Sequence, residues 1–158
     1  MLSNAQLATL KTDILADLVF VVIPNTLDGA FEIAQAYNLL AAPNYTVWKT
    51  SVSTQEIMEN GFIWTTVDSL TAGKARIWDW MTRLGQINPS RTNVRQGLAD
   101  AFGAGSAMAT AILPFLKRLS TRAEKLFATG TGSDASPGTM TFEGNLTYQE
   151  VYEARNLP

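Results

Sequence analysis

The sequence of 158 residues contains neither cysteine nor histidine. Without cysteine, the chain has no disulfide, no thiolate nucleophile and no thiolate metal ligand. Without histidine, it lacks the side chain that most often serves as a general base or binds zinc. Histidine-based catalytic triads and zinc sites built on His or Cys are therefore excluded, whereas the redox compartment remains undecided.

Long apolar runs are also missing. The most apolar window, Phe102–Leu116, is shorter than the ~20 residues that cross a bilayer, and Pro114 lies within it. The N-terminal stretch MLSNAQLATLKTD lacks the basic start and the apolar run of a secretory signal. We therefore expect a protein that stays in the cytosol where it is made and does not contact a membrane.

Charged residues make up 16% of the chain, and their signs are unevenly distributed. The segment from Lys74 to Lys125 contains nine basic and three acidic residues, a net charge of +6. The remainder contains three basic and eleven acidic residues, a net charge of −8. This asymmetry suits attraction to a charged partner or head-to-tail contact between copies, and it is equally typical of two solvated faces.

Capping-box motifs predict the starts of three helices, because a Ser or Thr is followed three residues later by Gln or Glu. These pairs are Ser3 with Gln6, Ser53 with Glu56, and Thr147 with Glu150. The first helix carries Leu7, Leu10 and Ile14 at helical spacing and ends in the β-branched run before Pro24.

Apolar spacing predicts four more helices. Their expected inner faces are, in chain order, Phe31, Ala34 and Tyr37; Leu70, Gly73, Ile77, Met81 and Leu84; Val94, Leu98, Ala101 and Phe102; and Phe115, Leu119, Ala123 and Leu126. Ser69 is expected to begin the second of these helices and Asn88-Pro89 the third. The fourth begins near Pro114, and its outer face is basic.

The segment after Ala128 differs in composition from the rest of the chain. Residues 129–138 contain only small or polar side chains, so no burial offsets the ~1–2 kcal/mol per residue that backbone ordering costs. We predict a mainly α fold. It comprises a compact helical bundle of residues 1–128 with a few short extended segments, such as NYTVWKTSV, and a flexible docking arm of residues 129–158.

Candidate chemical groups are few. Carboxylates occur in pairs at helical spacing: Asp13 with Asp17, Glu56 with Glu59, and Glu150 with Glu153. Such pairs serve glycoside hydrolysis or hold a divalent cation, but they are also typical of the solvated face of a helix, which is the interpretation favoured here. The loop GTGSDASPG resembles a phosphate-binding loop only in its glycines. We expect no enzyme activity, no cofactor and no metal.

Four tryptophans are many for a chain of this length. Trp78 and Trp80 lie two residues apart on an expected helix, so they cannot share a face, and one of them must lie near the surface. Tryptophan at a surface is either the rim of a core or an anchor for a protein partner.

Three stretches resemble a group of small proteins encoded among the head and tail structural genes of tailed bacteriophages. They are TVWKTSVSTQEI, NPSRTNVRQGLADAF and RLSTRAEKLFATGTGSDASPGTMTFEGNLTYQEV. The resemblance covers most of the chain, is strongest from Asn88 onward, and involves no catalytic signature. It implies a virion protein or an assembly factor.

Within that group, the head–tail connectors (adaptors) fit best, because they are small and helical and form a ring beneath the portal. The implied partners are further copies of the chain in a ring, expected to be twelve-fold, together with the portal protein, neighbouring tail or connector proteins and packaged DNA. The implied location is the virion, at the head–tail junction. The candidate interface consists of Arg91, Arg95, Lys117, Arg118, Arg122, Lys125, Met140, Phe142 and Tyr148.

Three other functions remain open at this point. A tail-end or head-decoration protein is also small and oligomeric, although such proteins usually show more strand pattern. A phage enzyme that uses two carboxylates requires a cleft in which one carboxylate has a raised pKa. A DNA-binding assembly factor requires an exposed basic surface and a salt-dependent affinity.

Overall fold

The computed structural model describes residues 1–158 and divides the chain into two units. Unit 1 consists of Met1–Tyr45 and Leu119–Pro158, and unit 2 consists of Thr46–Arg118. Unit 2 is thus inserted between two segments of unit 1. Helices make up 52% of the chain and the strands are short, so the expected helix-dominated fold is confirmed at that level.

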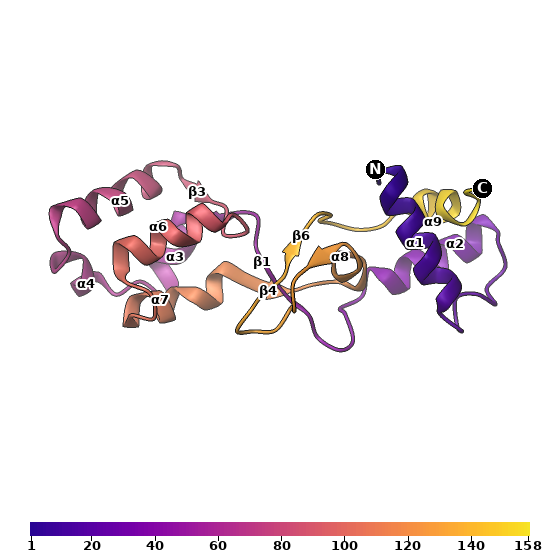
Figure 1. The fold of residues 1–158 in the computed structure, drawn as a ribbon, viewed down its shortest axis with the longest axis horizontal. Coiled ribbons are helices and arrows are strands. Elements are labelled where there is room, and N and C mark those ends of the chain that lie inside the picture. Colours follow the sequence, from indigo (N-terminus) through magenta and orange to yellow (C-terminus); the bar gives the residue numbers. More distant parts are fainter. The chain divides into compact units, whose positions relative to one another are not determined.

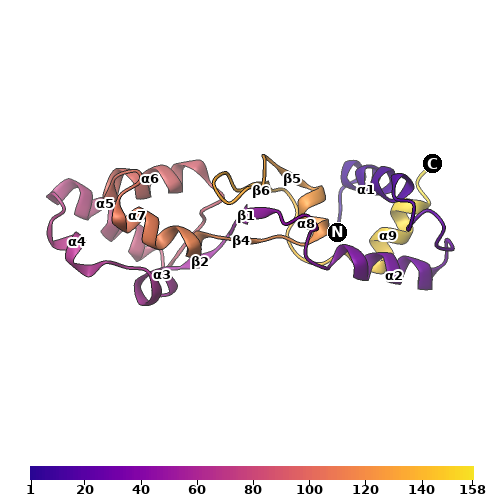
Figure 2. The same cartoon turned by 90° about the horizontal axis from the view of Figure 1, so that it is seen from below.

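Unit 1 contains four helices and one short antiparallel sheet (Figure 1). Its elements are α1 (Asn4–Ala16), α2 (Leu27–Tyr37), α8 (Arg122–Leu126), β5 (Ala128–Thr129), β6 (Thr139–Met140) and α9 (Tyr148–Arg155). Helix α9 packs against α1 and α2, and Figures 1 and 2 both show these three helices side by side. The predicted capping boxes at Ser3 and Thr147 are present at the starts of α1 and α9.

The core of unit 1 draws on both ends of the chain. Its buried residues are Leu2, Leu7, Leu10, Ile14, Phe20, Ala30, Ile33, Ala34, Tyr37, Ala123, Phe127, Leu146, Val151 and Ala154. Val151 and Ala154 of α9 are completely buried against this cluster. The predicted boundary at Ala128 and the docking arm of residues 129–158 are therefore wrong, because the apolar face of α9 is buried within the protein's own unit.

The segment 129–138 is packed against an aromatic ring that comes from elsewhere in unit 1. Tyr45 is buried, and its hydroxyl donates a hydrogen bond of 2.9 Å to the carbonyl of Gly130. A Cβ added to Gly132 would lie 2.1 Å from the Tyr45 ring, and one added to Gly138 would lie 2.6 Å from its hydroxyl. The segment was expected to be flexible because it has no large side chain, but its glycines let the backbone close around Tyr45 instead.

Unit 2 is formed from one continuous stretch of sequence. Its elements are β1 (Thr46–Trp48), β2 (Val52–Ser53), α3 (Thr54–Asn60), α4 (Trp64–Asp68), α5 (Ala72–Arg83), β3 (Gln86–Ile87), α6 (Thr92–Phe102), α7 (Ala107–Ile112), η1 (Leu113–Leu116) and β4 (Lys117–Leu119), which ends at the boundary with unit 1. Strand β2 pairs antiparallel with β3, and β1 pairs with β4. Helix α5 packs against α6, and α6 against α7.

The core of unit 2 is centred on an aromatic cluster. The ring of Trp78 stacks on Phe62 with centroids 5.0 Å apart and lies 5.2 Å from Phe102. Trp78 is buried whereas Trp80 is 61% exposed, which confirms that these two residues lie on different faces of α5.

Several sequence predictions for unit 2 and α2 need correction. Ser69 ends α4 rather than beginning α5, whose N-cap is Thr71. Asn88-Pro89 forms a turn before α6, which begins at Thr92. Leu84 and Phe31, both expected to be buried, are 70% and 52% exposed. Leu84 is the C-cap of α5 and lies beyond its last helical residue, whereas the inner face of α2 is formed by residues such as Ala30 and Ile33 rather than by Phe31.

The predicted basic helix from Pro114 to Phe127 does not exist. The chain forms the 3-10 helix η1 at Pro114, is extended through Lys117–Leu119, and starts α8 afresh with Thr121 as N-cap. The side chain of Thr121 accepts from the backbone N–H of Glu124, and the Glu124 carboxylate accepts from that of Thr121. This capping box is visible in the sequence as TRAE, but the apolar spacing from Phe115 to Leu126 obscured it.

Candidate partner interface

The nine residues of the predicted interface belong to two different units. Arg91, Arg95, Lys117 and Arg118 lie in unit 2, whereas Arg122, Lys125, Met140, Phe142 and Tyr148 lie in unit 1. Because β4 interrupts the expected helix, its four basic residues do not form one helical face. The predicted continuous interface is thus divided between the units.

Arg122 holds the two N-terminal helices of unit 1 together. Its guanidinium Nη2 donates to Asp13 Oδ2 at 3.1 Å and to Asp17 Oδ2 at 2.8 Å. The same group lies 4.5 Å from the ring centroid of Phe20 and 4.6 Å from that of Tyr37. The fixed fork of arginine thus satisfies two carboxylates while its plane contacts two rings. Arg122 was predicted to lie on the outer basic side of a helix as part of a partner interface, but its guanidinium contacts residues of its own unit.

The same contacts shift three pKa values. The hydrogen bond from Arg122 lowers the pKa of Asp17. Burial lowers the pKa of Arg122, but its hydrogen bond to Asp17 and the nearby Tyr37 and Asp13 outweigh that effect and raise it. Burial and a hydrogen bond to the Asp13 carboxylate raise the pKa of Tyr37. At neutral pH these shifts favour an ionised Asp17, a charged Arg122 and a neutral Tyr37 phenol.

Arg95 is likewise engaged within its own unit. Its guanidinium lies 4.8 Å from the centroid of the Trp48 ring, and Nη1 donates to the carbonyls of Pro89 and Ser90 at 2.6 and 2.9 Å. Burial lowers its pKa. Arg95 was expected on the outside of α6 beside Arg91, but it fastens the turn before α6 to Trp48 instead. Arg91 is exposed, as expected.

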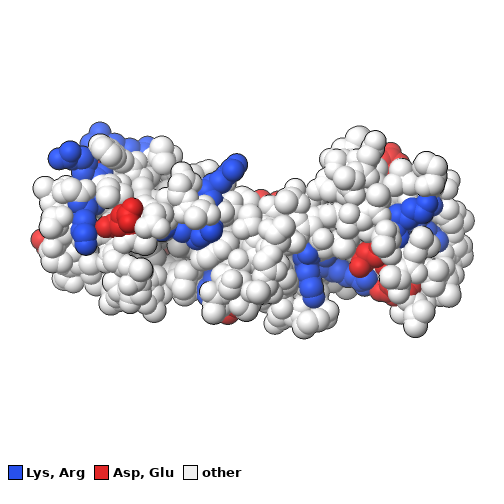
Figure 3. All heavy atoms as spheres, in the orientation of Figure 1, with Lys and Arg blue, Asp and Glu red and all other residues white.

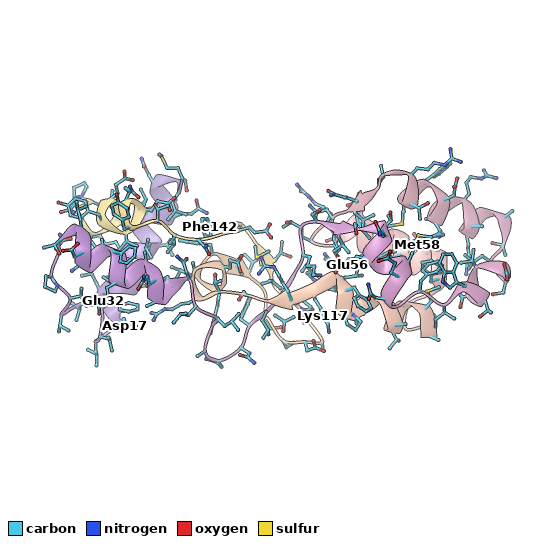
Figure 4. All side chains as sticks on the ribbon, turned by 180° about the vertical axis from the view of Figure 1, so that it is seen from behind. Asp17, Glu32, Glu56, Met58, Lys117 and Phe142 are labelled. Carbon is cyan, nitrogen blue, oxygen red and sulfur yellow. The ribbon has the colours of Figure 1, made fainter.

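The predicted interface residues of unit 1 also contribute to its packing. Met140 is buried, and the ring of Phe142, labelled in Figure 4, lies edge-on to Phe127 with centroids 5.5 Å apart. The Nζ of Lys125 lies 5.9 Å from the centroid of the Tyr45 ring. Tyr148 remains 38% exposed. Of the three apolar residues in the predicted interface, Met140 is thus buried, Phe142 is half-buried and Tyr148 is exposed.

The carboxylate pairs take part in local structural contacts. Asp13 and Asp17 bind Arg122, as described above. Glu56 forms an ion pair with Lys49 at 2.8 Å, and Glu150 accepts the backbone N–H of Leu2 at 2.9 Å in addition to capping α9. Glu56 and Asp17 are labelled in Figure 4. No group of three or more Asp or Glu side chains is arranged to hold a metal ion.

A groove with a volume of about 710 Å³ opens beside the Arg122 cluster in unit 1. Its polar side is formed by Asp13, Asp17, Arg122 and Lys125, and its apolar side includes Leu39 and Leu40. Those two leucines are 68% and 62% exposed. The groove therefore combines charged groups, of which Arg122 is already paired with Asp13 and Asp17, with exposed apolar side chains.

Exposed apolar side chains are the feature that the sequence prediction missed. On unit 1 they include Leu15, Leu18, Val19, Val21, Val22, Leu27, Phe31, Leu39 and Leu40; on unit 2 they are Trp64, Trp80 and Leu84. Leu18 and Val22 are 86% and 76% exposed. The run LVFVVI after α1 was interpreted only as the end of a helix, although within it only Phe20 is buried in the core and Ile23 packs against the core while partly exposed. An apolar run that lies in neither a helix nor a strand was the sequence feature that could have predicted this exposed apolar surface.

Comparison with known proteins supplies no relative for the chain. No protein-family model matches it, and no curated protein and no solved structure matches it either. No helix combines the length and the apolar character required to traverse a bilayer.

Proposed function

We propose that the protein is a structural component of a tailed-bacteriophage virion, and specifically a head–tail connector that forms a ring beneath the portal. The resemblance of three of its stretches to phage head and tail proteins directs the proposal to this class. The observation that carries it is the concentration of exposed apolar side chains on unit 1, which is typical of a surface that another protein covers.

The exposed apolar surface replaces the basic surface as the proposed site of assembly. Leu15, Leu18, Val19 and Val22 follow one another within eight residues at the end of α1 and the turn after it. Each loses contact with water when a partner packs on it, and that burial contributes about 25 cal/mol for every Å² of apolar area. Arg122 and Arg95 contribute less to binding than expected, because their charges are already paired or stacked within their units.

A nucleic-acid function receives less support from the same contacts. Phosphate binding requires cations that are free to replace counterions. Arg122 instead binds Asp13 and Asp17, and the whole of unit 1 carries four basic and nine acidic residues. Contact with protein is therefore proposed as the main role, and contact with packaged DNA as incidental.

The proposal is tested by mass spectrometry of purified virions from a phage that encodes the chain. We expect the protein to be present at a fixed ratio to the portal protein and to remain with the head–tail junction when tails are detached. Absence from the virion contradicts a structural role. Presence in the capsid shell alone, at a ratio far above that of the portal, supports a decoration protein and contradicts the connector.

A further inference from the structure

Helix α5 of unit 2 presents an outward face that combines apolar and cationic side chains. Arg76, Trp80, Arg83 and Leu84 follow the i, i+4, i+7, i+8 spacing that places residues on one side of a helix. Trp80 and Leu84 are 61% and 70% exposed, whereas Trp78 and Met81 are buried. We call these four residues the α5 face, and Figure 3 shows Lys and Arg side chains gathered over this part of unit 2.

The charges of the α5 face have little to bind within unit 2. Arg83 pairs with Asp79 one turn earlier at 2.9 Å, but both side chains are largely exposed, so the pair contributes little. Arg76 forms no ion pair in the unit. An exposed tryptophan between two arginines is the composition that dominates protein binding sites.

Helix α2 of unit 1 presents an outward face of similar apolar composition and opposite charge. Leu27, Asp28, Phe31 and Glu32 lie on one side of the helix, opposite the buried Ile33 and Tyr37. Leu27 and Phe31 are 55% and 52% exposed. Neither Asp28 nor Glu32 forms an ion pair within unit 1. We call these four residues the α2 face; Glu32 is labelled on α2 in Figure 4.

The two faces carry opposite charges. Each combines one aromatic residue and one leucine with two charges of the same sign, and the aromatic residue lies between the two charges in sequence. The units that carry them differ in the same sense, since unit 1 has a net charge of −5 and unit 2, with eight basic and five acidic residues, has +3. Complementary charge determines which faces meet, and burial of the apolar residues stabilises the contact.

We propose that the α2 face of one copy packs against the α5 face of a second copy. Phe31 and Leu27 then contact Trp80 and Leu84, while Asp28 and Glu32 lie opposite Arg76 and Arg83. Because the two faces differ, each copy retains one free α2 face and one free α5 face, so the contact propagates head to tail and closes into a ring or extends as a filament. The inference rests on the proposed function, in which copies assemble with one another.

The contact is small, and this determines how it behaves in solution. Helices of 11 and 12 residues are about 17 Å long at 1.5 Å per residue. A contact between two such helices therefore buries less surface area than a standard protein–protein interface. We expect a reversible association that depends on concentration. It weakens as salt rises, because the charges at its rim are screened, and it persists in part because Trp80 and Phe31 remain buried.

Sedimentation velocity over a concentration series tests the proposal with charge-swapped variants of the full chain. Arg76→Glu with Arg83→Glu reverses the α5 face, and Asp28→Lys with Glu32→Lys reverses the α2 face. Each double variant places like charges opposite one another, so its dissociation constant should rise on the order of 100-fold. An equimolar mixture of the two should associate again, because every reversed face then meets a reversed face of opposite sign.

A matched control reverses two charges away from the proposed contact. Lys74 is exposed on α5 outside the α5 face, and Arg91 is exposed at the start of α6. Lys74→Glu with Arg91→Glu changes the net charge by the same amount as the α5 variant and should leave association unchanged. Equal weakening by this control indicates an effect of total charge and overturns the proposed contact.

The remaining outcomes separate the contact from the proposed function. If the wild-type chain associates but both double variants associate equally well, the contact is wrong and assembly through another surface stands. A charge-reversed double variant could instead change the sedimentation coefficient by the same amount at every concentration, with no change in the dissociation constant. That result indicates that α2 and α5 meet within one chain, and it overturns the contact between copies. A wild-type chain that stays monomeric also overturns it, whereas detection in virions decides the proposed function independently.

Discussion

Units 1 and 2 both bury an apolar core, but they gather it from the chain in different ways. Unit 2 uses the continuous stretch Thr46–Arg118, whereas unit 1 joins Met1–Tyr45 to Leu119–Pro158. In unit 1 the C-terminal helix α9 therefore completes a core begun by α1 and α2. The core of unit 1 therefore requires the last residues of the chain, whereas the core of unit 2 does not.

The aromatic residues allow the two units to be followed separately. All four tryptophans (Trp48, Trp64, Trp78 and Trp80) lie in unit 2, and all four tyrosines (Tyr37, Tyr45, Tyr148 and Tyr152) lie in unit 1. Tryptophan fluorescence excited at long wavelength thus reports on unit 2. Near-ultraviolet circular dichroism of tyrosine reports mainly on unit 1.

The largest expected effect comes from ending the chain after Ala128. This removes Leu146, Val151 and Ala154 from the core of unit 1, and each larger apolar side chain contributes about 1.5–3 kcal/mol when buried. Because a whole domain is stable by only about 5–15 kcal/mol, unit 1 should unfold. Tryptophan fluorescence should still show the folded unit 2. A truncated chain in which the two remaining tyrosines, Tyr37 and Tyr45, keep their near-ultraviolet signal restores the docking-arm interpretation.

Reversing the charge of Arg122 should give the next largest effect. Arg122→Glu places a third carboxylate beside Asp13 and Asp17 and removes the cation from the Phe20 and Tyr37 rings. We expect unit 1 to lose about 2–3 kcal/mol in its free energy of unfolding, measured by denaturant titration of the tyrosine signal. Arg91→Glu makes the same charge change at an exposed position and should shift neither unit by more than about 0.5 kcal/mol. Equal effects of the two variants contradict the role of the Arg122 cluster.

A smaller effect is expected from Gly132→Ala. Gly132 has φ of +65°, and its Cβ would collide with the Tyr45 ring. Backbone strain and overpacking together should destabilise unit 1 by about 2 kcal/mol. Gly105 in unit 2 has a similar φ of +70° with no neighbour within 4 Å, so Gly105→Ala isolates the strain, at about 1 kcal/mol. Identical losses in the two variants indicate that segment 129–138 does not pack on Tyr45.

The smallest effect concerns the acid sensitivity of unit 1. Burial raises the pKa of Glu150, but hydrogen bonds from Thr147 and Leu2 outweigh it and lower the pKa below 4.5. Glu150 therefore stabilises unit 1 fully above pH 4.5, and this contribution is lost as the pH falls through the lowered pKa. Glu150→Gln should cost about 1 kcal/mol at neutral pH, measured by denaturant unfolding, and the difference from wild type should shrink in acid. A difference independent of pH contradicts the assignment.

Local signals in the sequence predicted the helices whose ends are fixed by their own residues. The capping residues Ser3 and Thr147 begin α1 and α9, and Gly103, with φ of +87°, ends α6 as expected. At Ser53 only half of the predicted box forms, because the Glu56 side chain turns to Lys49. These features require contacts no more than a few residues apart in the chain, so pattern reasoning reaches them.

The errors occurred where distant residues determine the structure. Leu119 has the spacing of a helical core residue, but it lies in β4, which pairs with β1, and it is 41% exposed. The segment 129–138 has no apolar side chain of its own, and Tyr45 supplies the ring that it packs on. Arg122 was judged exposed because Asp13 and Asp17 lie more than a hundred residues away in sequence. Composition and periodicity do not contain these pairings.

Hydrogen exchange of the full-length Val151→Ala variant tests most directly whether α9 belongs to the core of unit 1. Val151 is completely buried, and its truncation should cost about 2 kcal/mol. Amides of α1, α2 and α9 should then exchange about 30-fold faster together, while those of α5 and α6 exchange as in the wild type. Faster exchange confined to residues 129–158, with α1 and α2 unchanged, would contradict the division of the chain into these two units.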